Sequence, residues 1–180
     1  MEVNNRYIIT GGPGSGKSSL LNALINKEYK GFEEISRIVI REQHEINGDK
    51  LPWKNLAAFA EICFERMSKQ LRDCNSTNYC FYDRGIPDII AYVRRGSLKV
   101  PEKYYEKSNQ YNPIVFIAPP WQEIFINDAE RPESFDDSME IYQFLKETYN
   151  ELGFQTIELP KVSIKERVKF IENYLSACKD

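Results

Sequence analysis

The sequence predicts an α/β fold, with a mostly parallel sheet covered by helices on both faces. Short apolar runs alternate along the chain with longer segments whose apolar residues recur at helical spacing. No internal repeat or low-complexity linker interrupts this alternation. A chain of 180 residues, 42% of them hydrophobic, is long enough for one domain with a core and short for two. We therefore expect a single domain over residues 1–180, with about five parallel strands.

Five short segments have the character of buried strands. Residues 6–10 stop at a glycine cluster, and residues 114–118 form a continuous apolar run that ends at two prolines. The others lie within 31–36, at 79–83 and at 154–159. Parallel strands of such folds present ligands at their carboxyl ends, so the polar segments that follow these strands are expected to converge on one edge.

Helices are expected between the strands. The clearest spans 54–74, where apolar residues follow an i, i+3, i+4, i+7 stripe, and Gly153 stands where a helix-terminating glycine belongs. The stretch 121–134 has no clean period, and we expect it to form a short lid. The other expected helices lie at about 17–26, 37–45, 87–95, 138–152 and 164–178.

The segment from Gly11 to Ser18 matches G-x-x-x-x-G-K-[ST] and lies between the first strand and the first helix, as a phosphate-binding P-loop requires. Glycines let backbone N–H groups turn toward phosphate oxygens, and the helix N-terminus favours negative charge. Lys17 would reach the β- and γ-phosphates, and Ser18 would hold Mg²⁺. The motif predicts binding of ATP with Mg²⁺, GTP being an open alternative. The expected nucleotide-binding residues are Gly12, Gly14, Ser15, Gly16, Lys17, Ser18 and Ser19.

A dinucleotide-binding fold is excluded, because G-x-G-x-x-G would need glycine at the position of Lys17. An ordinary GTPase is not supported either. Asn26-Lys27-Glu28-Tyr29 fails N-K-x-D at its last position, and no D-x-x-G follows the third strand.

Asp83 ends the third strand, where P-loop proteins carry an acid that holds Mg²⁺. A helix cap or a surface ion pair is the alternative for Asp83. Arg84 beside it could clamp a carboxylate or phosphate, or pair with a nearby acid. Glu34 and Arg37 follow the second strand. Glu34 could accept a proton from a substrate hydroxyl and Arg37 could bind an anionic group, although a carboxylate at the start of a helix explains Glu34 equally well.

Arg131 lies in the aperiodic stretch after the fourth strand. An arginine on a lid would exclude water and neutralise charge during phosphoryl transfer, whereas a mixed-charge surface loop is the alternative. Trp53 and Trp121 are loop aromatics that could stack on a base or cap the core.

With these segments assembled, the chain resembles, over nearly its whole length, the small single-domain P-loop proteins known as AAA-type ATPases. These are similar to the kinase domain of the bifunctional nicotinamide riboside kinase. The most specific matching elements are Phe81-Tyr82-Asp83-Arg84-Gly85-Ile86-Pro87-Asp88 and Asp128-Ala129-Glu130-Arg131, and Glu34 with Arg37, Leu51-Pro52-Trp53, Pro119-Pro120 and Pro160 with Arg167 stand in the same order. Ser18 and Ser19 replace the commoner threonines.

The resemblance implies a P-loop NTPase three-layer sandwich with a nucleotide-kinase-like core and a short lid. It also implies that Glu34, Arg37, Arg84, Asp88 and Arg131 are site residues. In that site Lys17, Asp83, Glu34 and Arg131 would act in catalysis, and Glu34, Arg37, Arg84 and Asp88 would bind the acceptor.

Composition argues against several classes of protein, among them nucleic-acid-binding, membrane, secreted and zinc proteins. A net charge of −3 gives no electrostatic case for nucleic-acid binding. No apolar run approaches the length of a membrane span and no secretory signal is evident, so a cytoplasmic protein without a membrane partner is expected. The four cysteines form no C-x-x-C pair and are expected as buried reduced thiols. His44 is the only histidine, which disfavours zinc and most histidine chemistry.

Two functions compete. A small-molecule kinase would transfer the γ-phosphoryl group to a nucleoside-like acceptor, and the polar residues beyond the phosphate loop favour it. A nucleotide-dependent switch with slow hydrolysis would need no acceptor. A hexameric AAA machine is a weaker third, because the chain lacks room for an added helical domain. The acceptor and the oligomeric state are not predicted.

Overall fold

Five parallel strands form one sheet in the order β2-β3-β1-β4-β5. The computed structural model describes residues 4–74, 78–126 and 133–177 of the chain. Ile8 of β1 lies opposite Tyr82 of β3 on one side and Val115 of β4 on the other. The α/β fold with a parallel sheet is therefore confirmed. The strands are β1 (Arg6–Gly11), β2 (Lys30–Phe32), β3 (Cys80–Asp83), β4 (Ile114–Ala118) and β5 (Gln155–Glu158).

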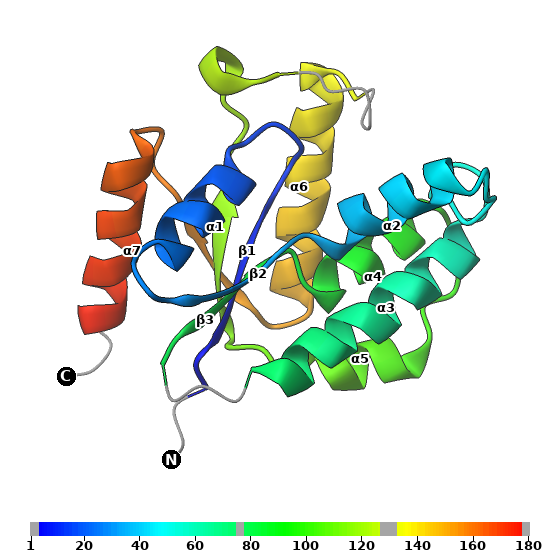
Figure 1. Cartoon of the computed structure of the whole chain (residues 1–180), viewed down its shortest axis with the longest axis horizontal. Helices are drawn as coiled ribbons and strands as arrows, with labels where there is room; N and C mark the ends of the chain where they lie inside the picture. The colour runs from blue at the N-terminus through cyan, green and yellow to red at the C-terminus, as the bar shows by residue number, and fades with distance from the viewer. Residues whose placement is uncertain (1–3, 75–77, 127–132, 178–180) are drawn as a thin grey trace.

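Helices cover both faces of the sheet (Figure 1). The helices α1 and α7 pack on one face, and the helices α2 to α6 pack on the other. None of the helices in the described ranges combines the length and the apolar composition that crossing a bilayer requires. The helical elements are α1 (Lys17–Ile25), α2 (Ile35–Glu45), α3 (Leu56–Asp73), α4 (Ile86–Arg95), α5 (Glu102–Ser108), the 3₁₀ turn η1 (Gln122–Ile124), α6 (Phe135–Glu151) and α7 (Ile164–Ala177).

The central strands are mostly apolar because both of their faces are buried. Successive side chains point to opposite faces, so Ile8 and Tyr82 contribute to the core under α3, α4 and α6. Ile9, Phe81 and Phe116 contribute to the second core under α1 and α7. The sheet is thus fixed from both sides, and the ends of β1 and β3 become a rigid edge for the segments that follow them.

Most expected elements are present with shifted ends. The helix expected at 138–152 begins earlier, at Phe135, because the Ser134 hydroxyl accepts a hydrogen bond from the backbone N–H of Asp137 and caps it. Gly153 has φ 83°, which confirms it as the residue that ends α6. Helix α5 was not expected, since it is short and highly charged. It is held through buried Tyr104, whose ring stacks on Phe64 of α3.

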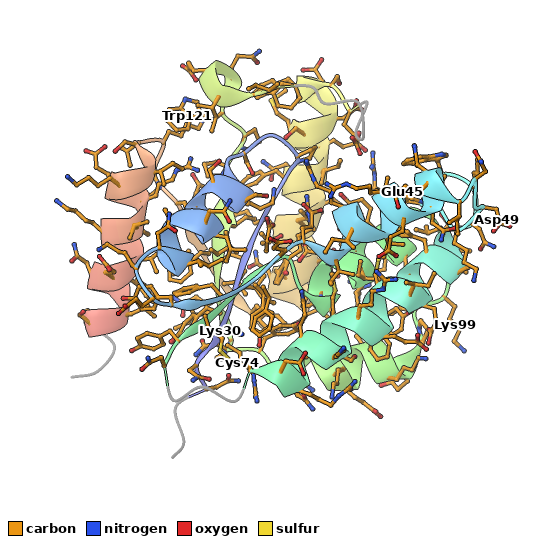
Figure 2. The ribbon with its side chains drawn as sticks, in the orientation of Figure 1. Lys30, Glu45, Asp49, Cys74, Lys99 and Trp121 are labelled. Atoms are coloured by element: carbon orange, nitrogen blue, oxygen red, sulfur yellow. A yellow bond between two sulfur atoms is a disulfide. The ribbon has the colours of Figure 1, made fainter. Side chains whose placement is uncertain are left out.

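The cysteines require a correction. Cys74 and Cys80 form a disulfide and are not reduced thiols, because the end of α3 lies beside the start of β3 and their Cα atoms are 6.6 Å apart. Figure 2 labels Cys74 at the end of α3. Cys63 is a buried free thiol, as expected. Cys178 lies outside the described residues.

Candidate active site

The phosphate loop connects β1 to α1 and has the backbone shape that its glycines predict. Gly14 and Gly16 have φ 69° and 83°, the left-handed region that glycine adopts without strain. A Cβ atom at Gly14 would lie 2.5 Å from the Phe125 ring, so the loop also needs glycine for packing. Figure 1 shows this loop beside the first turns of α6, where the Ser138 hydroxyl donates to the carbonyl of Pro13.

Lys17 begins α1 and is only 4% exposed. Its Nζ donates to the carbonyl of Gly12 at 2.7 Å and to the Ser15 hydroxyl at 3.2 Å. A buried ammonium must be hydrogen-bonded, and the loop itself supplies these acceptors. Lys17 therefore lies folded along the loop at the N-terminus of α1, where phosphate oxygens are electrostatically favoured.

Ser18 and Asp83 meet next to the loop. The Ser18 hydroxyl donates to Oδ2 of Asp83 at 2.7 Å, and the Asp83 side chain is 2% exposed. Its other oxygen, Oδ1, is buried without a hydrogen-bond partner among the described residues. An orphaned carboxylate oxygen beside a hydroxyl is a donor set that suits a hard cation such as Mg²⁺. In the described ranges, no cluster of three or more His, Cys, Asp or Glu side chains offers another metal site.

Arg84 follows Asp83 and has φ 68°, an uncommon conformation for a residue other than glycine. Its backbone N–H donates to the carbonyl of Ile9, which extends the pairing of β1 and β3 by one residue. The turn directs the guanidinium inward, where Nε bonds Oε1 of Glu34 at 3.0 Å and Nη1 bonds Oδ1 of Asp88 at 3.1 Å. All three side chains are at most 5% exposed.

Neighbouring side chains stabilise the positive charge of Arg84. Burial alone would lower the pKa of the guanidinium, but Tyr92, Asp88 and Asp83 raise that pKa above its ordinary value. Arg84 is therefore a permanent cation between two carboxylates. A buried arrangement of this kind is stable only if each charge is compensated.

Asp88 is completely buried and accepts hydrogen bonds from parts of the chain far apart in sequence. Thr10 Oγ1 and the Tyr149 hydroxyl each donate at 2.5 Å, and the backbone N–H of Gly85 donates at 2.9 Å. Together with Arg84, these donors engage both carboxylate oxygens. Asp88 lines a cavity, as a substrate-binding residue would, but its bonds indicate that it positions Arg84 instead of binding a ligand directly.

Two cavities open beside these groups. The first, the loop-side cavity, has a volume of about 170 Å³ and is lined by Ser18, Asp83, Glu34, Arg37 and Arg41, among others. The second, the aromatic cavity, has a volume of about 40 Å³ and is lined by Glu34, Trp53, Phe59, Arg84, Asp88, Tyr92 and Glu133, among others.

Glu34 lines both cavities. It caps the start of α2 as a backbone position, and its Oε1 also accepts a hydrogen bond from the Ser36 hydroxyl at 2.8 Å. Glu34 therefore lies at the start of a helix, as the alternative expected, and its carboxylate is also on the walls of both cavities. Arg37 lies one turn further along α2, on the wall of the loop-side cavity.

Arg167 of α7 is a site residue that the residue patterns alone did not single out. It is fully buried, and it donates from Nε to the carbonyl of Pro160 at 2.8 Å and from Nη1 to the carbonyl of Ser15 at 2.9 Å. Its guanidinium carbon lies 5.1 Å from the centre of the Trp121 ring, and Figure 2 labels Trp121 above the start of α7. The sequence did carry one signal for Arg167, because this charged residue stands among the apolar residues of the stripe that α7 buries.

The other expected residues take different positions. Ser19 is exposed on the first turn of α1, and Trp53 is 55% exposed at the edge of the aromatic cavity. Arg131 lies outside the described residues. Thr10, Tyr149 and Glu133 were not expected as site residues, because each comes close to the other site residues only through contacts made in the folded chain.

Comparison with known proteins places this geometry in a family. Residues 6–167 match the model of a family described as an AAA domain. The chain belongs to this AAA domain family. The resemblance seen in the sequence is thereby confirmed. A search of curated proteins finds no match.

Solved structures share the fold of this AAA domain protein. Shikimate kinase from Acinetobacter baumannii, in complex with shikimate, matches with TM-score 0.62 and 15% identity over 99% of this chain and 96% of that one. Deoxyadenosine kinase from M. mycoides matches with TM-score 0.56 and 17% identity over 95% and 98%. Thymidylate kinase from Candida albicans matches with TM-score 0.60 and 14% identity over 97% and 92%. At such identities the likeness shows the P-loop kinase fold.

Proposed function

We propose that this protein is an ATP-dependent small-molecule kinase that transfers the γ-phosphoryl group to a hydroxyl of a nucleoside-like acceptor. The observation that carries the proposal is the place of Glu34. Its carboxylate lines the cavity beside Ser18 and Asp83, and it also lines the cavity with aromatic walls. A protein that only holds a nucleotide has no need of the second cavity. We further propose one domain over residues 1–180, with a lid at about 121–134.

The phosphate loop and its surroundings would hold the nucleotide. The backbone N–H groups from Gly12 to Lys17 would surround the phosphates, and the Lys17 ammonium would leave its loop acceptors for phosphate oxygens. Ser18 and Asp83 would hold Mg²⁺. The ion would neutralise charge on the phosphates.

Glu34 would orient the acceptor hydroxyl. Its contact with the Arg84 guanidinium stabilises the ionised carboxylate, so it can accept a hydrogen bond from a hydroxyl and align that oxygen with the phosphoryl group. Asp83, which lines the loop-side cavity, is the alternative group for this role. Arg37 and Arg41 bring positive charge to the loop-side cavity, where the transferred group would pass. Arg131 would act from the lid.

The aromatic cavity would receive the rest of the acceptor. Trp53 and Phe59 offer ring surfaces, and Arg84 and Glu34 offer polar groups. At about 40 Å³ the cavity is smaller than usual ligand sites of about 300 Å³ or more, so an acceptor of nucleoside size would enlarge it on binding. Exposed Trp53 forms the part of the wall that can move without disturbing the core. The kinases that share the fold act on small molecules, which supports this assignment.

The test is a panel of nucleosides and related hydroxyl compounds incubated with ATP and Mg²⁺, with phosphorylated products detected by mass spectrometry. We expect at least one product with the native protein and none above background with Lys17→Ala. Glu34→Gln should still bind ATP but transfer about 100-fold more slowly or worse. ATP hydrolysis without any phosphorylated compound across the panel would contradict the proposal and favour a nucleotide-dependent switch.

A further inference from the structure

Glu133 is a carboxylate that the reaction described above does not use. It immediately precedes Ser134, the residue that caps α6, and its side chain lines the aromatic cavity. Its Oε2 is buried and has no hydrogen-bond partner among the described residues. A buried carboxylate oxygen left without a donor is costly unless a ligand or water supplies one.

The charges around the aromatic cavity do not balance without a ligand. Glu34, Asp88 and Glu133 line it, and Arg84 is the cation on its wall. Arg84 is engaged by Glu34 and Asp88, at 3.0 Å and 3.1 Å, whereas no ion pair is found for Glu133 within the described residues. The end of the cavity formed by Glu133 is therefore an acceptor of hydrogen bonds with a negative charge.

Tyr92 is a neighbouring residue on which the Glu133 charge acts. Burial raises the pKa of the Tyr92 hydroxyl, Arg84 lowers it, and the carboxylates of Asp88 and Glu133 raise it. Tyr92 also lines the cavity, so the Glu133 carboxylate is close enough to act on a group inside it. Its field favours a donor or a positive charge there and disfavours a carbonyl oxygen.

We propose that Glu133 is a specificity-determining residue that accepts a hydrogen bond from an amino group on the ring of the acceptor. The acceptor would lie against Trp53 and Phe59, with its hydroxyl end at Glu34 and its amino end at Glu133. This inference rests on the proposed function, since it names the class of acceptor that the same site takes. Amino-bearing bases are selected over bases with a carbonyl at the same place, because a carbonyl oxygen would face an unpaired carboxylate.

Binding measurements on matched pairs test the inference. Adenosine and inosine differ by an amino group against a carbonyl, and cytidine and uridine differ in the same way. We expect calorimetric titration of the native protein to show about tenfold or tighter binding of the amino member of at least one pair. Glu133→Gln should bring that ratio close to one, because an amide can both donate and accept. Glu147→Gln, which removes an equal charge from an exposed position on α6, the helix that follows Glu133, should keep the native ratio.

Equal affinity within both pairs, a preference that survives Glu133→Gln, or no binding of any of the four compounds at millimolar concentration would overturn the inference. Circular dichroism melting of both variants checks that they are folded.

Different results would contradict the proposed kinase activity. Selective binding that depends on Glu133 but yields no phosphorylated product would support the role of Glu133 and contradict the kinase activity. Phosphoryl transfer without selectivity between the members of a pair would support the kinase activity and contradict the role of Glu133.

Discussion

Replacing Arg84 by methionine should destabilise the fold strongly, because it leaves Glu34 and Asp88 buried without their shared cation. The three side chains are 2%, 5% and 0% exposed, so water cannot take over the role of the guanidinium. Breaking a buried pair by removing one partner costs about 3–5 kcal/mol. In a domain of this size that corresponds to a fall in melting temperature of about 6–20 °C.

Urea denaturation measures this effect as the loss of unfolding free energy in Arg84→Met relative to the native protein. Arg84→Lys should recover only part of the loss, since an ammonium cannot reproduce the two-directional hydrogen bonding of the guanidinium.

Arg66 provides the matched control. It also makes two hydrogen bonds to a carboxylate, that of Glu42, but their side chains are 39% and 44% exposed. Arg66→Met should therefore change the unfolding free energy by about 1 kcal/mol or less. If Arg84→Met costs no more than Arg66→Met, the reasoning on the buried arrangement is refuted.

Four further predictions concern other parts of the site and the fold. Ser18→Ala should weaken ATP binding about tenfold in the presence of Mg²⁺ and leave binding in EDTA nearly unchanged, as measured by titration calorimetry; an equal loss in both conditions would contradict a metal role. Arg167→Met should lower the unfolding free energy by about 2 kcal/mol and weaken ATP binding, because the carbonyls of Ser15 in the phosphate loop and of Pro160 lose their donor; unchanged affinity would show that the arginine does not position the phosphate loop. Reduction of the disulfide should lower the unfolding free energy by about 2 kcal/mol in the native protein and have no effect when Cys74 and Cys80 are both replaced by serine. Burial raises the pKa of the Cys63 thiol to about 12, so alkylation of this residue at pH 8 should require unfolding, and rapid labelling of the folded protein would contradict its burial.

The sequence predicts the features that depend on short-range constraints. The phosphate loop is defined by glycines and a lysine at fixed spacing between a strand and a helix, and those neighbours appear where the apolar pattern places them. Asp83 could be predicted at the edge of the sheet because it directly follows an apolar run. The sheet order itself depends on pairings between distant segments, and periodicity carries no information about them.

Features built from distant residues could not be predicted. Glu34 and Arg84 are separated by 50 positions, and Arg167 reaches a carbonyl 152 positions away. Such contacts arise from the packing of α2 and α7 on the sheet, which no local pattern specifies. The disulfide was missed for a related reason, because its cysteines lie six positions apart and only the places of α3 and β3 in the fold bring them together.

The central claim is that a nucleotide bound at the phosphate loop passes its γ-phosphoryl group to an acceptor bound in the aromatic cavity. The most direct measurement follows ADP and the phosphorylated acceptor in the same reaction, after the binding pairs have identified an acceptor. We predict that the two products form in a one-to-one ratio and that both disappear with Lys17→Ala. Release of ADP with inorganic phosphate, at a rate that does not change when the acceptor is added, would contradict the account.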